Sequence, residues 1–237
     1  MRKLFMLFSV FLTVLALLSL PQGAAAQLAA GVQLSYGWTN FSSILSNDEG
    51  AESSGVLNGV WAHYDHDDLR FTGAYQGTFG FGNDAIRRHL GQIAASYRVL
   101  EEGPMQVFAG LGYHFITTNF KGSLGNQPKD FSLSGHGFAG QVNVDIELTP
   151  QLRASAVLTA SPWVKWSFNL DKDATIDTRS SFNAKLDLTY QLSDQLSVQV
   201  GLLGGGYRVP KFTSGGKTLG TTKGSFSALS VGVTQRF

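Results

Sequence analysis

A short segment rich in histidine and aspartate is the first candidate for chemistry in this sequence. His63, Asp65, His66, Asp67 and Asp68 lie close together along the chain. Imidazole and carboxylate groups are suitable ligands for divalent metals. Ligand types that are merely near in sequence do not fix a coordination geometry, however. We therefore interpret the segment as a solvated turn and predict no metal site.

A histidine base beside a serine hydroxyl is the second candidate, because this pair can carry out acyl transfer. His114 and His136, with Ser132 and Ser134 nearby, supply the residue types but no recognisable catalytic spacing. We expect the two histidines to be isolated groups in a lumen or at a rim. The glycine-rich segment 201–206 lacks a following GK[ST] and is interpreted as a place where a strand bends.

Composition excludes several other kinds of site. The chain has no cysteine, which excludes disulfides, thiolate metal centres and thiol nucleophiles. Its net charge of +1 lacks the basic excess of a nucleic-acid-binding protein. We predict no catalytic residue, no cofactor and no nucleic-acid partner.

The N-terminal residues predict a cleaved signal peptide, 1–26. Arg2 and Lys3 precede an apolar run over 4–20, and a small-residue segment ends at Ala26. A single membrane anchor is the alternative, although the run is at the short limit for a spanning helix. Export leaves one mature domain, 27–237, whose net charge falls to −1 when the two basic residues are lost.

Alternation of apolar and polar residues with a period of two dominates the mature chain and predicts strands. Long and short connections alternate along it. The predicted strands are 30–38, 55–64, 69–81, 88–99, 105–115, 138–148, 152–160, 182–192, 196–202 and 229–237. The long connections are 40–54, 82–87, 118–130, 163–181 and 210–224, and short turns fall near 65, 102, 150 and 194.

The polar faces of these strands are rich in Ser, Thr, Gln, Asn and Gly but contain few charges, which is unusual for a water-facing surface. A lipocalin-like barrel or a sandwich with an apolar interior is thus the weaker interpretation. The pattern favours an all-β, closed, antiparallel, up-and-down transmembrane barrel, with ten strands or, as the alternative, eight. Six aromatic residues near loop ends are the predicted girdle: Trp38, Phe81, Tyr113, Trp163, Trp166 and Phe182.

The signal peptide ending in AAAQ, the alternating strands and the last strand SALSVGVTQRF resemble those of small outer-membrane β-barrel proteins of diderm bacteria. The resemblance implies an outer-membrane location and contact with membrane lipids and lipopolysaccharide. It also implies that the barrel-assembly machinery recognises the terminal Phe237. Gln235 departs from the apolar or aromatic residue that the family often has there. A shared architecture says little about activity.

Charged residues on the polar parity predict the contents of the lumen. They are Arg70, Arg98, Arg153, Lys185 and Arg236 with Asp145, Glu147 and Asp187. Two hypotheses remain open: a charge network that partly fills the barrel, or the lining of a narrow pore with a slight preference for anions. The predicted function is accordingly a small passive pore or a structural membrane protein, monomeric and without catalysis.

The long loops suggest a different function, in which the outer rim recognises lipopolysaccharide or a partner. Lys211, Lys217 and Lys223 make one loop basic, and Asp48, Glu49 and Glu52 make another acidic. A lipid-A-modifying enzyme or an omptin-like protease is the less favoured interpretation. The His/Asp segment falls in a short turn, hence on the periplasmic side, which argues against the protease.

Overall fold

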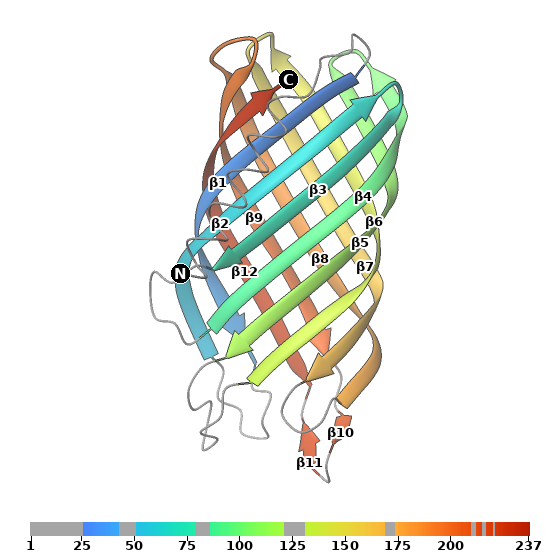
Figure 1. The fold of residues 1–237 in the computed structure, drawn as a ribbon, viewed down its shortest axis with the longest axis vertical. Helices are drawn as coiled ribbons and strands as arrows, with labels where there is room; N and C mark the ends of the chain where they lie inside the picture. Colours follow the sequence, from blue (N-terminus) through green and yellow to red (C-terminus); the bar gives the residue numbers. More distant parts are fainter. Residues whose placement is uncertain are drawn as a thin grey trace.

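The computed structural model describes residues 26–42, 51–78, 86–120, 131–168, 174–209, 212–214, 217–219 and 221–237. Ten long antiparallel strands form a closed barrel in these ranges, and two short strands form a separate hairpin (Figure 1). Within the described ranges, no helix is both long enough and apolar enough to cross a membrane.

Each barrel strand pairs with its neighbour in sequence, except that β12 pairs with β9 across the small hairpin, and β1 closes the barrel by pairing with β12. The barrel strands are β1 (Ala26–Phe41), β2 (Ala51–His66), β3 (Leu69–Thr78), β4 (Ile86–Glu102), β5 (Met105–Phe120), β6 (Phe131–Thr149), β7 (Leu152–Phe168), β8 (Ala174–Gln191), β9 (Leu196–Val209) and β12 (Thr222–Arg236). The hairpin consists of β10 (Phe212–Ser214) and β11 (Lys217–Leu219). The prediction of ten strands is confirmed, and the alternative of eight is wrong.

Tight turns join the strands at one end of the barrel. Asp67 and Gly103 adopt positive φ angles of 53° and 55° in the first two of these turns, and such angles suit glycine and aspartate at tight corners. The final strand ends at the same side, where the backbone N–H of Phe237 donates to the carbonyl of Leu28 at 2.9 Å. The β10–β11 hairpin lies at the opposite end of the barrel, which we call the long-loop end (Figure 1).

The strands are longer than the sequence pattern predicted. Several segments predicted as loops are partly strand: β7 continues to Phe168 and β8 begins at Ala174, inside the predicted loop 163–181. A strand needs about 9–11 residues to cross a bilayer, whereas β6 has 19. The strands therefore project beyond the membrane, where apolar residues no longer have to face outward and the simple alternation is lost.

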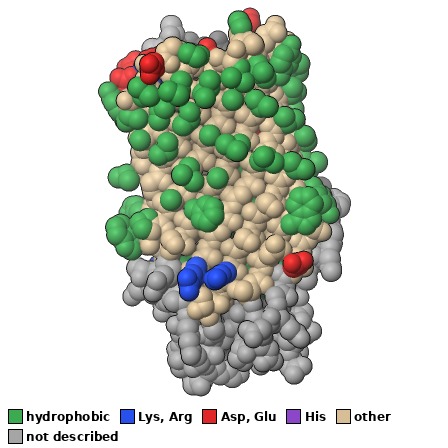
Figure 2. All heavy atoms as spheres, turned by 180° about the vertical axis from the view of Figure 1, so that it is seen from behind, with side chains coloured by type: hydrophobic (Ala, Val, Ile, Leu, Met, Phe, Trp, Pro, Cys, Tyr) green, Lys and Arg blue, Asp and Glu red, His purple; other side chains and the backbone are tan. Residues whose placement is uncertain are grey.

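The outer wall of the barrel is apolar and exposed. Along β1, the outward residues Val32, Leu34, Tyr36 and Trp38 are each about half exposed, between 47% and 51%. Figure 2 shows hydrophobic side chains over the wall of the barrel and charged ones near its two ends. An exposed apolar belt of this extent fits lipid rather than water. The soluble lipocalin-like alternative is therefore excluded.

The predicted aromatic girdle is right in part. Trp38, Trp163 and Phe182 are exposed on the outer wall, and Tyr113 is half-buried there. The prediction for Trp166 is wrong, because its side chain is 1% exposed and belongs to a cluster inside the barrel. Phe81 lies outside the described residues.

Candidate functional site

The barrel lumen contains two layers of opposite character. Near the tight turns the inward side chains are polar or charged, and toward the long loops they are mostly apolar. A change of parity along the strands produces the second layer. In β1 the apolar residues face outward up to Trp38, but Phe41 is inward and 5% exposed. In β5 the same change occurs between Phe115, which is outward, and Ile116, which is 1% exposed.

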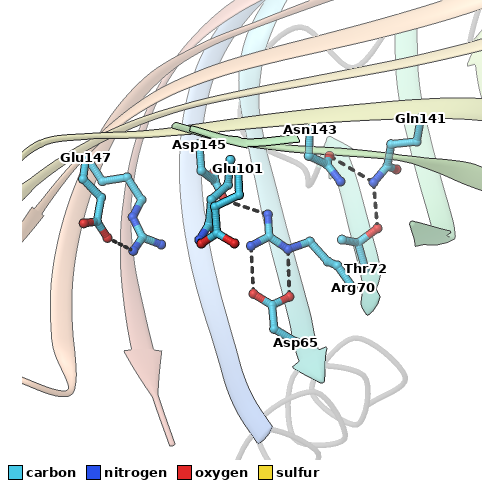
Figure 3. Close-up of polar contacts among 10 residues, drawn as sticks. Asp65, Arg70, Thr72, Glu101, Gln141, Asn143, Asp145 and Glu147 are labelled. Carbon is cyan, nitrogen blue, oxygen red and sulfur yellow. Dashed lines mark hydrogen bonds and ion pairs between the residues drawn. The ribbon is translucent and has the colours of Figure 1, made fainter. Parts of the chain in front are cut away.

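Arg70 organises the polar layer. Its Nε and Nη2 donate to the two carboxylate oxygens of Asp65 at 2.7 and 2.8 Å, and its Nη1 donates to Asp145 at 2.6 Å (Figure 3). The guanidinium also lies 3.9 Å from the ring centroid of Phe108. Asp65 is the cross-strand neighbour of Arg70, whereas Asp145 comes from β6, with two strands in between. This second ion pair therefore crosses the lumen.

Two other ion pairs complete the polar layer. Arg153 donates to Glu147 at 2.9 Å, and the Lys185 ammonium is 2.9 Å from Asp187. Lys185 also lies 5.3 Å from the ring centroid of Trp61, which belongs to β2 on a nearly opposite side of the barrel. Long side chains thus contact each other across the narrow interior.

A cavity of about 150 Å³ lies within the polar layer, and six of the eight predicted lumen charges line it. They are Arg70, Asp145, Arg153, Lys185, Asp187 and Arg236. Arg98 and Glu147 are not in its lining. Arg98 donates to Asp68 at 3.0 Å and lies 3.4 Å from Glu101, which places it at the rim near the tight turns.

Apolar side chains fill the other half of the lumen, and we call this cluster the lumen plug. It consists of Phe41, Ile86, Leu90, Ile116, Phe120, Leu133, Val164, Trp166, Phe168, Tyr207 and Val209. The ring of Phe41 packs edge-on against Phe120, with centroids 4.7 Å apart, and against Tyr207 at 5.9 Å. Trp166 lies 4.5 Å from Tyr207. These four rings come from β1, β5, β9 and β7, so the plug is built from around the barrel.

Arg88 is a buried cation that lies between two residues of the lumen plug on β4, Ile86 and Leu90. It is 5% exposed, its guanidinium is 3.2 Å from the ring centroid of Phe226, and it contacts the Asn183 amide oxygen at 3.5 Å. No carboxylate among the described residues forms an ion pair with it. Gly205 makes room for the Phe226 ring, because an added Cβ would lie 2.4 Å from it. The glycine-rich segment thus serves packing, and β9 keeps its pairing through it.

The His/Asp segment is divided between different surroundings. His63 lines the lumen cavity, Asp65 is bound to Arg70, and Asp68 is bound to Arg98. The exposed His66 and Asp67 lie 3.8 Å apart. Over the described part of the chain, no group of three or more His, Asp and Glu side chains is placed to hold a metal ion.

The histidines of the acyl-transfer hypothesis lie on opposite faces of the barrel wall. His114 is fully buried in the lumen, whereas His136 is exposed outside and bonds to the Tyr113 hydroxyl. The hydroxyl of Ser134 lies 3.2 Å from the hydroxyl of its cross-strand neighbour Thr117, on the outer side of the wall. The structure therefore separates His114 from His136 and Ser134, which both lie on the outer face of β6.

The outer edge of the apolar belt carries basic residues. Lys223 and Arg208 are direct cross-strand neighbours, and both are exposed. Lys and Arg side chains are visible at this edge in Figure 2. Glu52 is exposed on β2, whereas Lys211, Asp48 and Glu49 lie outside the described residues, as does the side chain of Lys217.

The lumen plug and Arg88 were missed by sequence reasoning. The signal that could have revealed the plug is the parity reversal, in which apolar residues move from even to odd positions after Trp38 and from odd to even after Phe115. No sequence signal distinguishes Arg88 from a residue with a carboxylate partner.

Comparison with known proteins supports the fold. No protein-family profile matches the chain, and no curated protein matches it. The outer membrane protease OmpT from Escherichia coli has a similar structure, with a TM-score of 0.64, 10% identity, and coverage of 92% of this chain and 99% of OmpT. Neisserial surface protein A aligns with a TM-score of 0.40 and 12% identity, covering 91% of this chain and all (100%) of that protein. Ail of Yersinia pestis aligns at 0.34 and 11%, covering 88% and 98%.

The closed barrel with its apolar outer belt belongs to the class of outer-membrane β-barrels. Its location is the outer membrane, where that belt faces lipid. At 10% identity the similarity to OmpT concerns the fold alone and does not transfer an activity.

Proposed function

We propose that this protein is a non-catalytic structural component of the outer membrane whose lumen is closed, rather than an open passive pore. The meeting of four rings, from β1, β5, β7 and β9, inside the barrel supports this proposal. Barrels of about eight strands have an interior that side chains can fill, and ten strands exceed that size only slightly. A polar layer crossed by Arg70 and Asp145 adds a second obstruction.

Planar-bilayer recording of the refolded protein tests this proposal, with a heat-modifiable gel shift to verify that the barrel has formed. We expect no reproducible unitary conductance from the wild-type protein. The double variant Phe41→Ala/Tyr207→Ala removes two of the central rings and is expected to leak more than the wild type. A steady wild-type conductance of uniform size would contradict a closed lumen and restore the pore hypothesis.

Binding of lipid phosphate at the outer rim is a second candidate function. The exposed pair Arg208 and Lys223 lies at the edge of the apolar belt, where the phosphates of lipopolysaccharide would meet the protein. Two adjacent cations attract a phosphate, although salt screens exposed charges. We expect Arg208→Gln/Lys223→Gln to weaken lipopolysaccharide binding in micelles, while Arg98→Gln at the opposite rim leaves it unchanged. Equal binding by all three proteins would refute this role.

A further inference from the structure

We propose that the cavity in the polar layer binds a small inorganic oxyanion of the phosphate or sulfate class, with Arg236 as its principal ligand. The cavity has a volume of about 150 Å³ and lies on the tight-turn side of the lumen plug. The anion binds at equilibrium from that side, so no passage through the barrel is required.

The distribution of ion pairs leaves Arg236 unmatched. Four cations line the cavity, namely Arg70, Arg153, Lys185 and Arg236. Arg70 forms ion pairs with two carboxylates, those of Asp65 and Asp145. Arg153 and Lys185 form one ion pair each. Among the described residues, no carboxylate oxygen forms an ion pair with Arg236. Because a partly buried guanidinium loses hydration, an anion beside it would offset that loss.

The position of Arg236 favours a shared anion. It is the last residue of β12, and its backbone N–H donates to the Gln195 carbonyl at 2.8 Å, so its backbone is fixed. Arg153 repels it electrostatically, whereas Glu147 and Asp145 attract it without forming an ion pair with it. Both side chains line the same cavity, and the Arg153 side chain is 33% exposed, which leaves an approach from water. An oxyanion between the two guanidiniums would reduce their repulsion and accept hydrogen bonds from both.

Two amides in the cavity wall have their oxygens engaged and their nitrogens without an acceptor. The Gln199 oxygen accepts from the Thr234 hydroxyl at 3.3 Å, and the Asn143 oxygen accepts from the Gln141 amide at 3.1 Å. The nitrogens of Gln199 and Asn143 have no hydrogen-bond partner. Two oxygens in the lining, of Gln92 and Asp187, also lack a partner, so these amide donors support an anion only together with the unmatched Arg236.

Isothermal titration of the refolded protein in zwitterionic detergent tests the site, with sodium phosphate, sodium sulfate and sodium chloride at constant ionic strength. We expect saturable heat with phosphate or sulfate. Arg236→Gln should weaken the affinity by about tenfold or more, because it removes a charge-assisted hydrogen bond. Arg98→Gln makes the same change of charge at the rim outside the cavity and should leave the affinity within about twofold of the wild type.

Absence of saturable heat with both oxyanions would overturn the proposal. So would equal weakening by Arg236→Gln and Arg98→Gln, which would indicate a general effect of charge, or equal binding of chloride, which would exclude an oxyanion site. The gel shift reports whether each variant folds. If Arg236→Gln does not fold, Arg153→Gln tests the same cavity and is also expected to weaken binding. Conductance measurements are separate, so this inference and the closed lumen can fail independently.

Discussion

The edge-on pair of Phe41 and Phe120 offers a quantitative test of the lumen plug. Their centroids are 4.7 Å apart, and the two side chains are 5% and 1% exposed. Truncation of a well-buried phenylalanine to alanine costs about 3–5 kcal/mol in the free energy of unfolding. An aromatic pair contributes about 0.5–1.5 kcal/mol beyond its burial. We therefore expect each single variant, Phe41→Ala and Phe120→Ala, to lose about 3–4 kcal/mol.

A double-mutant cycle isolates the contact between the two rings. The double variant should lose about 1 kcal/mol less than the sum of the single losses, because the first truncation already removes the pair. Urea unfolding of the protein in lipid vesicles, followed by tryptophan fluorescence, provides the free energies. Phe41 paired with the outward Phe138, which is 75% exposed, is the control cycle and should be additive to within about 0.5 kcal/mol.

Single losses below about 1 kcal/mol would refute a packed lumen plug, since a ring in a packed interior cannot be removed at so small a cost. Equal coupling in the two cycles would also contradict it. Such a result would mean that Phe41 and Phe120 do not meet across the lumen.

Two buried arginines and one pair of tryptophans can be tested by substitution. Arg70→Met should reduce the free energy of unfolding by about 3–5 kcal/mol, because it leaves Asp65 and Asp145 without their cation. Arg98→Gln at the exposed rim should cost clearly less. Comparable losses in urea unfolding would contradict the cross-lumen pair. Arg88→Met should leave the free energy of unfolding unchanged or raise it by about 1 kcal/mol or more. The reason is that an apolar side chain replaces a buried cation that has no carboxylate partner. A large loss in urea unfolding would contradict this. In single-tryptophan variants, lipid-soluble quenchers should reduce the fluorescence of Trp163, which is 69% exposed. They should leave the fluorescence of Trp166 unchanged, because that side chain is 1% exposed. Equal quenching would place Trp166 on the outside of the barrel.

The sequence was sufficient for the strand number and for the direction in which most side chains point. Alternation determines the face of each residue within a strand, so it assigns Asp145 and Lys185 to the polar face, and both line the lumen cavity. Alternation does not determine the stagger between strands. The contact between Arg70 and Asp145 depends on that stagger over three successive pairings and was not predictable.

Trp166 illustrates a different limit. An aromatic residue near a loop end fits both a membrane girdle and a packed interior, and its parity decides between them. Trp163 and Trp166 differ in parity, which places the first outside and the second in the lumen plug. The sequence pattern predicts a loop over 163–181, and in a loop the parity of a residue does not indicate the face on which it lies. The difference between the two tryptophans was therefore not predicted.

The parity reversal has a consequence for how the molecule is held together. Toward the tight turns the wall is apolar outside and polar inside, so lipid is the solvent that favours this half. Toward the long loops, Phe41, Phe120 and Trp166 form an interior core, as in a water-soluble barrel, and the hydrophobic effect stabilises that half directly. The same ten strands thus form two stacked barrels of opposite polarity. Removal of lipid should destabilise the first half, and chaotropes should destabilise the second. A shared set of backbone hydrogen bonds couples the two halves.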